Sequence, residues 1–222
     1  MKRLCRYFSL LFFSVLLILT AMAAVGLEEY DSNIINSTED YVLLQNRYGG
    51  ITITAYRGTE RIIEIPQSIN GIPVTIIGTK AFYSKDLAEV IIPESVLIIE
   101  PMAFADNQLE SVTIPGSSYI GYEAFANNQL DTVNLSAQLA SIGPRAFFNN
   151  NLSAISIPQR VTSIGRDAFA GNPISIITVG ANRNLFSSQG FEISFVNYYI
   201  SQDRIAGVYI KTGRIWVLQE NE

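Results

Sequence analysis

Apolar side chains recur along the chain in a fixed frame of about 22 residues between Ile77 and Gly180. The dipeptide Ala-Phe returns five times in this stretch, at spacings of 22, 21, 22 and 22 residues. Around each pair the frame reads Ile-Gly, two variable residues, Ala-Phe, a short polar run and Leu-x-x-Val-x-Ile-Pro. A fixed period of this length is typical of a solenoid, because each unit exposes an apolar face that only its neighbours can cover.

Within each unit the apolar positions predict one short strand, since residues two apart on a strand share a face. The two inward columns are Val90, Val112, Val133, Ile155, Ile177 and Ile92, Ile114, Leu135, Ile157, Val179. A third column, just before the strand, is Leu87, Leu109, Leu130, Leu152, Ile174. With coils ~4.8 Å apart, the Ala-Phe phenylalanines predict a continuous aromatic rib in the core. These core residues are Phe82, Phe104, Phe125, Phe147 and Phe169.

The rest of each unit has room for only a single turn, helical or tight, at Ala-Phe. We therefore expect an α/β solenoid with a parallel β-sheet on one face and short helical turns on the other. Residues 41–66 predict an N-terminal β-hairpin cap, with strands at 41–44 and 51–56, and the first coil. Residues 67–180 are the repeats, with a turn-forming insertion at Asn70-Gly71. Residues 181–222, with strands expected at 208–210 and 215–218, form a C-terminal β cap.

Residues 1–24 have the three-part layout of a secretory signal peptide. Lys2, Arg3 and Arg6 precede an apolar run at 7–19, and small residues follow at 21–24. An uncleaved membrane anchor is the alternative, but the run is short for a spanning helix of ~20 residues. Residues 25–40 are polar and acidic without a sustained period, which indicates a flexible segment.

The charge balance narrows the range of partners. The chain of 222 residues is 48% hydrophobic and has 15 basic and 20 acidic residues. Without the leader it keeps 12 basic and 20 acidic residues, a net charge of −8. A net negative charge disfavours binding to nucleic acid and to anionic membranes. We therefore expect no nucleic-acid partner and no stable membrane insertion after the leader is removed. The only cysteine, Cys5, lies in the leader, so we expect no disulfide.

The residue types argue against catalysis. The chain contains no histidine, which removes the Ser-His-Asp arrangement and the commonest metal ligand. Carboxylates fall at variable positions of different units, so we expect no enzyme, no cofactor and no metal site. An asparagine recurs three residues after the phenylalanine of four units, and we interpret it as a bond to local backbone rather than as a ligand ladder. These asparagines are Asn107, Asn128, Asn150 and Asn172.

The candidate binding surface is the exposed face of the predicted sheet, whose side chains are mostly small and hydroxylic. It consists of Glu89, Ile91, Ser111, Thr113, Thr132, Asn134, Ala154, Ser156, Ile176 and Thr178. Such a face can accept another protein without desolvating a strong charge, but it is also an ordinary soluble strand face. Binding through the aromatic residues near the C-terminus, or through the convex side, stays open.

The repeat resembles the BspA-like, or Treponema pallidum-type, leucine-rich repeats of exported surface proteins. The likeness rests on Ile142-Gly143-Pro144-Arg145-Ala146-Phe147 followed by Leu152-Ser153-Ala154-Ile155-Ser156-Ile157-Pro158. The resemblance implies a leucine-rich repeat solenoid, secreted or displayed at the cell surface or in the periplasm, that binds a host or neighbouring-cell protein in adhesion. A self-associating structural component of the cell envelope is the alternative.

Overall fold

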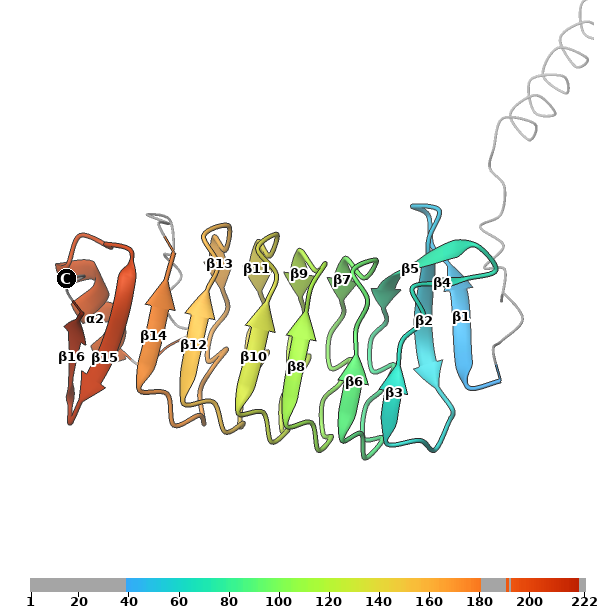
Figure 1. The fold of residues 1–222 in the computed structure, drawn as a ribbon, viewed down its shortest axis with the longest axis horizontal. Helices are drawn as coiled ribbons and strands as arrows, with labels where there is room; N and C mark the ends of the chain where they lie inside the picture. Colours follow the sequence, from blue (N-terminus) through green and yellow to red (C-terminus); the bar gives the residue numbers. More distant parts are fainter. Residues whose placement is uncertain (1–38, 181–190, 192, 220–222) are drawn as a thin grey trace, which may run out of the picture. The chain divides into compact units, whose positions relative to one another are not determined.

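The computed structural model describes residues 39–180, 191 and 193–219, and the repeats within them form a β-solenoid (Figure 1). Each coil contributes one strand to a front row of parallel strands. These strands are β3 (Ile62–Glu64), β6 (Glu89–Ile91), β8 (Ser111–Ile114), β10 (Thr132–Leu135), β12 (Ala154–Ile157) and β14 (Ile176–Val179). The strands pair in register within β3–β6, β8–β10 and β12–β14, as Val133 with Val112 and Ile155 with Ile177, and these pairs lie next to each other in the row. The predicted parallel sheet is therefore present.

A second parallel ladder runs behind the first; it starts with the six-residue β5 and continues with strands of two residues. It consists of β5 (Ile72–Ile77), β7 (Ile98–Ile99), β9 (Tyr119–Ile120), β11 (Ser141–Ile142) and β13 (Ser163–Ile164). Glycines follow four of these five strands, and Glu100 follows β7; the coils approach closely at the glycines. A Cβ on Gly143 would lie 2.6 Å from the carbonyl carbon of Gly121, a distance that real Cβ atoms do not show. The Ile-Gly of the repeat thus allows backbone to pack on backbone.

The prediction of short helical turns opposite the sheet is wrong. In residues 41–180 the Ala-Phe segments are tight turns, and the residue before Ala has a left-handed backbone, as in Met102 (φ 59°) and Arg145 (φ 55°). These residues donate their N–H to the next coil: Met102 to the carbonyl of Tyr122 at 2.8 Å and Arg145 to that of Arg166 at 2.9 Å. Backbone groups that a helix would pair internally are paired between coils instead.

The N-terminal hairpin is present. β1 (Tyr41–Gln45) pairs antiparallel with β2 (Ile51–Tyr56), and β2 pairs parallel with β5, so the hairpin joins the rear ladder. The insertion is a second small hairpin, in which β4 (Ser68–Ile69) pairs with β5. Its turn has positive φ at both central residues, 53° at Asn70 and 79° at Gly71, which suits these two residue types.

The C-terminal segment differs from an all-β cap. The two predicted strands are present as β15 (Gly207–Thr212) and β16 (Ile215–Leu218), with β15 antiparallel to β14 and to β16. A helix, α2 (Ile193–Ser201), precedes them and contacts β16. Its aromatic-rich sequence has high strand propensity, and the helix forms because it covers the inner side of β15 and β16.

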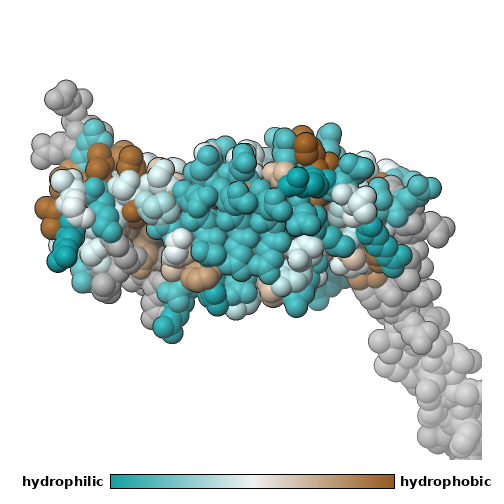
Figure 2. All heavy atoms as spheres, turned by 90° about the horizontal axis from the view of Figure 1, so that it is seen from below, coloured by the Kyte–Doolittle hydropathy of each residue, from teal (hydrophilic) through white to brown (hydrophobic). Residues whose placement is uncertain are grey.

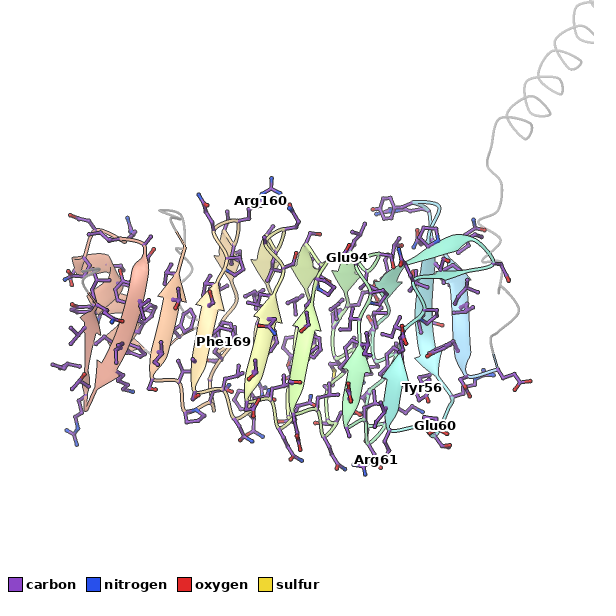
Figure 3. The ribbon with its side chains drawn as sticks, viewed as in Figure 1. Tyr56, Glu60, Arg61, Glu94, Arg160 and Phe169 are labelled. Atoms are coloured by element: carbon purple, nitrogen blue, oxygen red, sulfur yellow. The ribbon has the colours of Figure 1, made fainter. Side chains whose placement is uncertain are left out.

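The core matches the predicted columns. The five Ala-Phe rings are almost fully buried and stack with centroids 5.0 to 5.5 Å apart. Tyr56 extends the rib by stacking on Phe82 at 5.4 Å, and Phe191 does so on Phe169 at 4.9 Å. Tyr56 and Phe169, labelled in Figure 3, lie toward opposite ends of this rib. The predicted signal peptide, residues 1–24, and all but the last two residues of the segment 25–40 lie outside the described residues.

Candidate functional site

The ten residues of the predicted binding surface lie on the outward side of the front strands, which we call the front face. Nine of them are exposed, and Thr178 is half-buried because β15 pairs beside it. The register aligns them in rows: Ser111 lies opposite Thr132, and Thr113 opposite Asn134. The structure therefore brings the predicted residues together, while their role in binding stays a prediction.

The centre of the front face is small and uncharged. Ser111, Thr132, Ala154 and Ser156 place short side chains over three consecutive coils. The Asn134 amide donates to the hydroxyl of Thr113 at 3.3 Å, so even the largest central side chain is held along the sheet. A protein that docks here covers hydroxyl and methyl groups, and no charge loses its water in the centre.

The front face is larger than the sequence indicated. β15 and β16 continue it, because Ile210 lies opposite Ile176 on one side and Val217 on the other. Ile215 and Val217 are 64% and 43% exposed. Alternating apolar residues in 207–212 and 215–218 indicated these two strands. The repeat ends at Gly180, however, so the period did not place them beside the front strands. Figure 2 shows hydrophobic surface gathered at its left end, where the C-terminal strands lie.

At the other end, β3 adds Ile62 and Glu64 to the front face. Ile62 lies opposite Glu89, and Glu64 lies opposite Ile91. Ile62 and Ile91 are 65% and 50% exposed. The front face thus has apolar side chains at both ends, with two carboxylates at the N-terminal end.

The repeated asparagines are structural. Asn107 accepts a hydrogen bond from the Leu87 N–H at 3.0 Å and donates to the carbonyls of Phe82 at 2.8 Å and Phe104 at 3.0 Å. Asn128, Asn150 and Asn172 repeat this pattern one coil later each time. Both ends of each amide are occupied by backbone, so the interpretation as local backbone bonding is confirmed.

The C-terminal aromatic residues are core rather than anchors. Phe195, Tyr199, Tyr209 and Trp216 are at most 3% exposed and pack on one another. Burial, together with neighbouring tyrosine hydroxyls, raises the pKa of Tyr209 to about 12. Between α2 and the β15–β16 turn lies an open groove of about 490 Å³, bordered by Tyr198, Arg214 and Trp216 among others. Most aromatic side chains near this groove are buried in the core and cannot contact a partner. The front face is therefore the better candidate for a binding surface.

Side chains that could bind a metal ion are not gathered in the described ranges. No set of three or more Asp, Glu, His or Cys side chains there is placed to hold a metal ion. The Glu123 carboxylate is instead paired with the Arg145 guanidinium at 2.9 Å. The described part of the chain also has no helix of sufficient length and apolar character to cross a membrane.

Comparison with known proteins agrees with this architecture. Residues 75–196, more than half of the chain, match the BspA type leucine rich repeat region in six copies. Among solved structures, a leucine-rich repeat protein from Bacteroides ovatus is 24% identical with a TM-score of 0.58, and the pneumococcal vaccine antigen PcpA is 20% identical with a TM-score of 0.51. Each alignment covers 68% of this chain but only 42% and 50% of those chains. None of the curated proteins compared with the sequence matches it. The matched residues include the coils from β6 to β14, and the chain belongs to the BspA-type leucine-rich repeat family.

Proposed function

We propose that the protein is an exported, non-enzymatic leucine-rich repeat module that binds another protein through its front face. The observation that carries the proposal is the uncharged centre of that face, flanked by exposed Ile62, Ile91 and Ile176. Flanking apolar side chains supply surface to bury, and the small central residues let a partner approach the sheet. An adhesin-like role at the cell surface is the function that this arrangement supports best.

Rigidity favours binding by this face. Each front strand pairs with at least one neighbouring strand, and the buried asparagines hydrogen-bond the loops of adjacent coils to each other. Little conformational entropy is therefore lost when a partner docks. Export is proposed from the sequence of residues 1–24, whose basic, apolar and small-residue regions fit a signal peptide.

The two ends of the stack serve as caps in this proposal. An uncovered solenoid end would expose both apolar surface and a strand edge. Tyr56 of the N-terminal hairpin stacks on the first rib ring, and Phe191 stacks on the last one. Because the ends of the aromatic rib are covered, less apolar core is available for association there, which favours the front face.

The experiment compares two triple variants in surface plasmon resonance against host matrix proteins and surface proteins of neighbouring cells. The front-face variant is Ser111→Arg, Thr132→Arg, Ser156→Arg. The matched control adds the same charge to exposed positions elsewhere on the same coils, as Ser118→Arg, Ala140→Arg, Thr162→Arg. We expect the wild type and the control to bind at least one protein and the front-face variant to lose it, with unchanged melting temperatures. Binding that survives in the front-face variant, or no binding by the wild type, would overturn the proposal.

A further inference from the structure

The two halves of the chain have opposite charge. Residues 39–131 contain twelve acidic and five basic residues, a net charge of −7, whereas residues 132–219 contain three acidic and seven basic residues, a net charge of +4. The coils stack in chain order, so one half of the stack is acidic and the other basic. Figure 3 illustrates this along one edge, where Glu94 lies in the acidic half and Arg160 in the basic half.

The apolar residues of the front face follow the same division into two ends. Ile62 and Ile91 lie on the strands of the acidic half, and Ile176, Ile215 and Val217 lie on those of the basic half. The three coils between them present Ser, Thr, Asn and Ala instead.

We infer that the front face binds a second copy of this chain, face to face and with the two solenoids antiparallel. This inference rests on the proposed function, because it names a partner for the same face. A two-fold interface requires a surface that is complementary to itself. In the antiparallel arrangement the acidic half of each copy faces the basic half of the other, and the apolar ends meet twice.

The strand order fixes the pairing. The front face runs β3, β6, β8, β10, β12, β14, β15, β16, so its midpoint lies between β10 and β12. Strand β3 then faces β16 of the second copy, which brings Ile62 over Ile215 and Val217. Strands β3 and β6, which carry Glu64 and Glu89, face β16 and β15, and the exposed Arg214 lies in the turn that joins those two strands.

The centre of the interface is compatible with this packing. Two β-sheets pack ~10 Å apart, which requires side chains of modest size between them. Thr132 faces Ala154 of the second copy across the midpoint, and no charged side chain is buried there. The strands are only three to four residues long, so the contact area is small and the dimer is weak. It would also compete with a foreign protein for the front face.

Sedimentation velocity of the purified chain over a concentration series tests the inference. We expect a dimer in low salt that weakens at about 1 M salt, where the Debye length is ~3 Å. Glu64→Lys with Glu89→Lys should weaken it about tenfold, as should Arg214→Glu. The control Glu39→Lys with Glu94→Lys changes the same charge at exposed acids off the front face and should change the dissociation constant less than about twofold.

Mixing the two charge variants gives the decisive result. Glu64→Lys/Glu89→Lys chains and Arg214→Glu chains repel their own copies but attract each other, so the mixture should recover the dimer. A wild type that stays monomeric in low salt, equal weakening by the control, or no recovery on mixing would each overturn the inference. A monomer that still binds a foreign protein through the front face would refute self-association alone and leave the proposed function intact.

Discussion

The side-chain oxygen of Asn150 accepts a hydrogen bond from the backbone N–H of Leu130, one coil earlier, at 3.0 Å. The same amide donates to the carbonyls of Phe125 at 2.9 Å and Phe147 at 3.2 Å. One buried side chain therefore satisfies backbone groups of two coils. Because similar bonds recur at Asn107, Asn128 and Asn172, they link the coils along the whole stack.

We expect Asn150→Ala to destabilise the protein by about 2 to 4 kcal/mol, since buried Leu130 N–H and Phe125 C=O groups lose their partner. Asn151→Ala is the control: Asn151 is exposed and makes a single long bond to the Gln129 carbonyl at 3.4 Å. Its loss should be less than about 0.5 kcal/mol. Urea unfolding measures both, and equal losses would contradict a specific role of the ladder.

The adjacent residues Phe147 and Phe148 provide a matched test of the aromatic rib. Phe147 is fully buried between two rib rings, whereas Phe148 is half-buried and lies under the Arg145 guanidinium at 4.1 Å. We expect Phe147→Ala to cost about 3 to 5 kcal/mol, through lost burial and the cavity left behind. Phe148→Ala should cost about 1 kcal/mol. Calorimetric melting decides, and a similar loss for both would refute the rib as the main core element.

Gly143→Ala tests the close approach of the rear coils. The new Cβ would clash with the backbone of Gly121, which is held by inter-coil hydrogen bonds and cannot move aside. We expect a loss of about 3 kcal/mol in the free energy of unfolding. In the control Gly207→Ala, the new methyl meets only the flexible Leu218 side chain, at 2.6 Å, and the cost should be smaller. The prediction fails if urea denaturation midpoints of the two variants coincide.

The repeat region was predictable because five units report the same constraint. Val90, Val112 and their equivalents must all face inward if any of them does, so alternation fixed both the core and the front-face positions. The asparagine at the bend was predictable for a similar reason: a polar side chain repeated beside a buried ring needs backbone partners.

Features that occur only once in the chain, or that do not require a particular side chain, could not be predicted from the sequence. The left-handed turn positions hold Lys80, Met102, Glu123, Arg145 and Asp167, whose side chains share no chemistry. The first four donate their backbone N–H to the next coil, and these bonds set their conformation. Helix α2 occurs once, and its aromatic residues resemble strand. The extension of the front face onto β15 and β16 follows from tertiary pairing with β14 and has no repeat signature.

Tyr209 predicts a loss of stability at high pH. Its hydroxyl donates to the Ile205 carbonyl at 2.5 Å, and burial raises its pKa to about 12 from an ordinary value of 10.0. The stabilisation is complete below pH 10 and is lost as the pH rises through about 12, because the unfolded chain releases this proton first. Tyr209→Phe should cost about 1 kcal/mol at pH 8 but reduce the decline between pH 10 and 12. Urea denaturation midpoints across that pH range measure the decline in stability.

Tyr48→Phe is the control, since Tyr48 is 69% exposed and the loss of its hydroxyl should leave the decline unchanged. An equal decline in wild type and Tyr209→Phe would show that this buried hydroxyl does not govern alkaline stability.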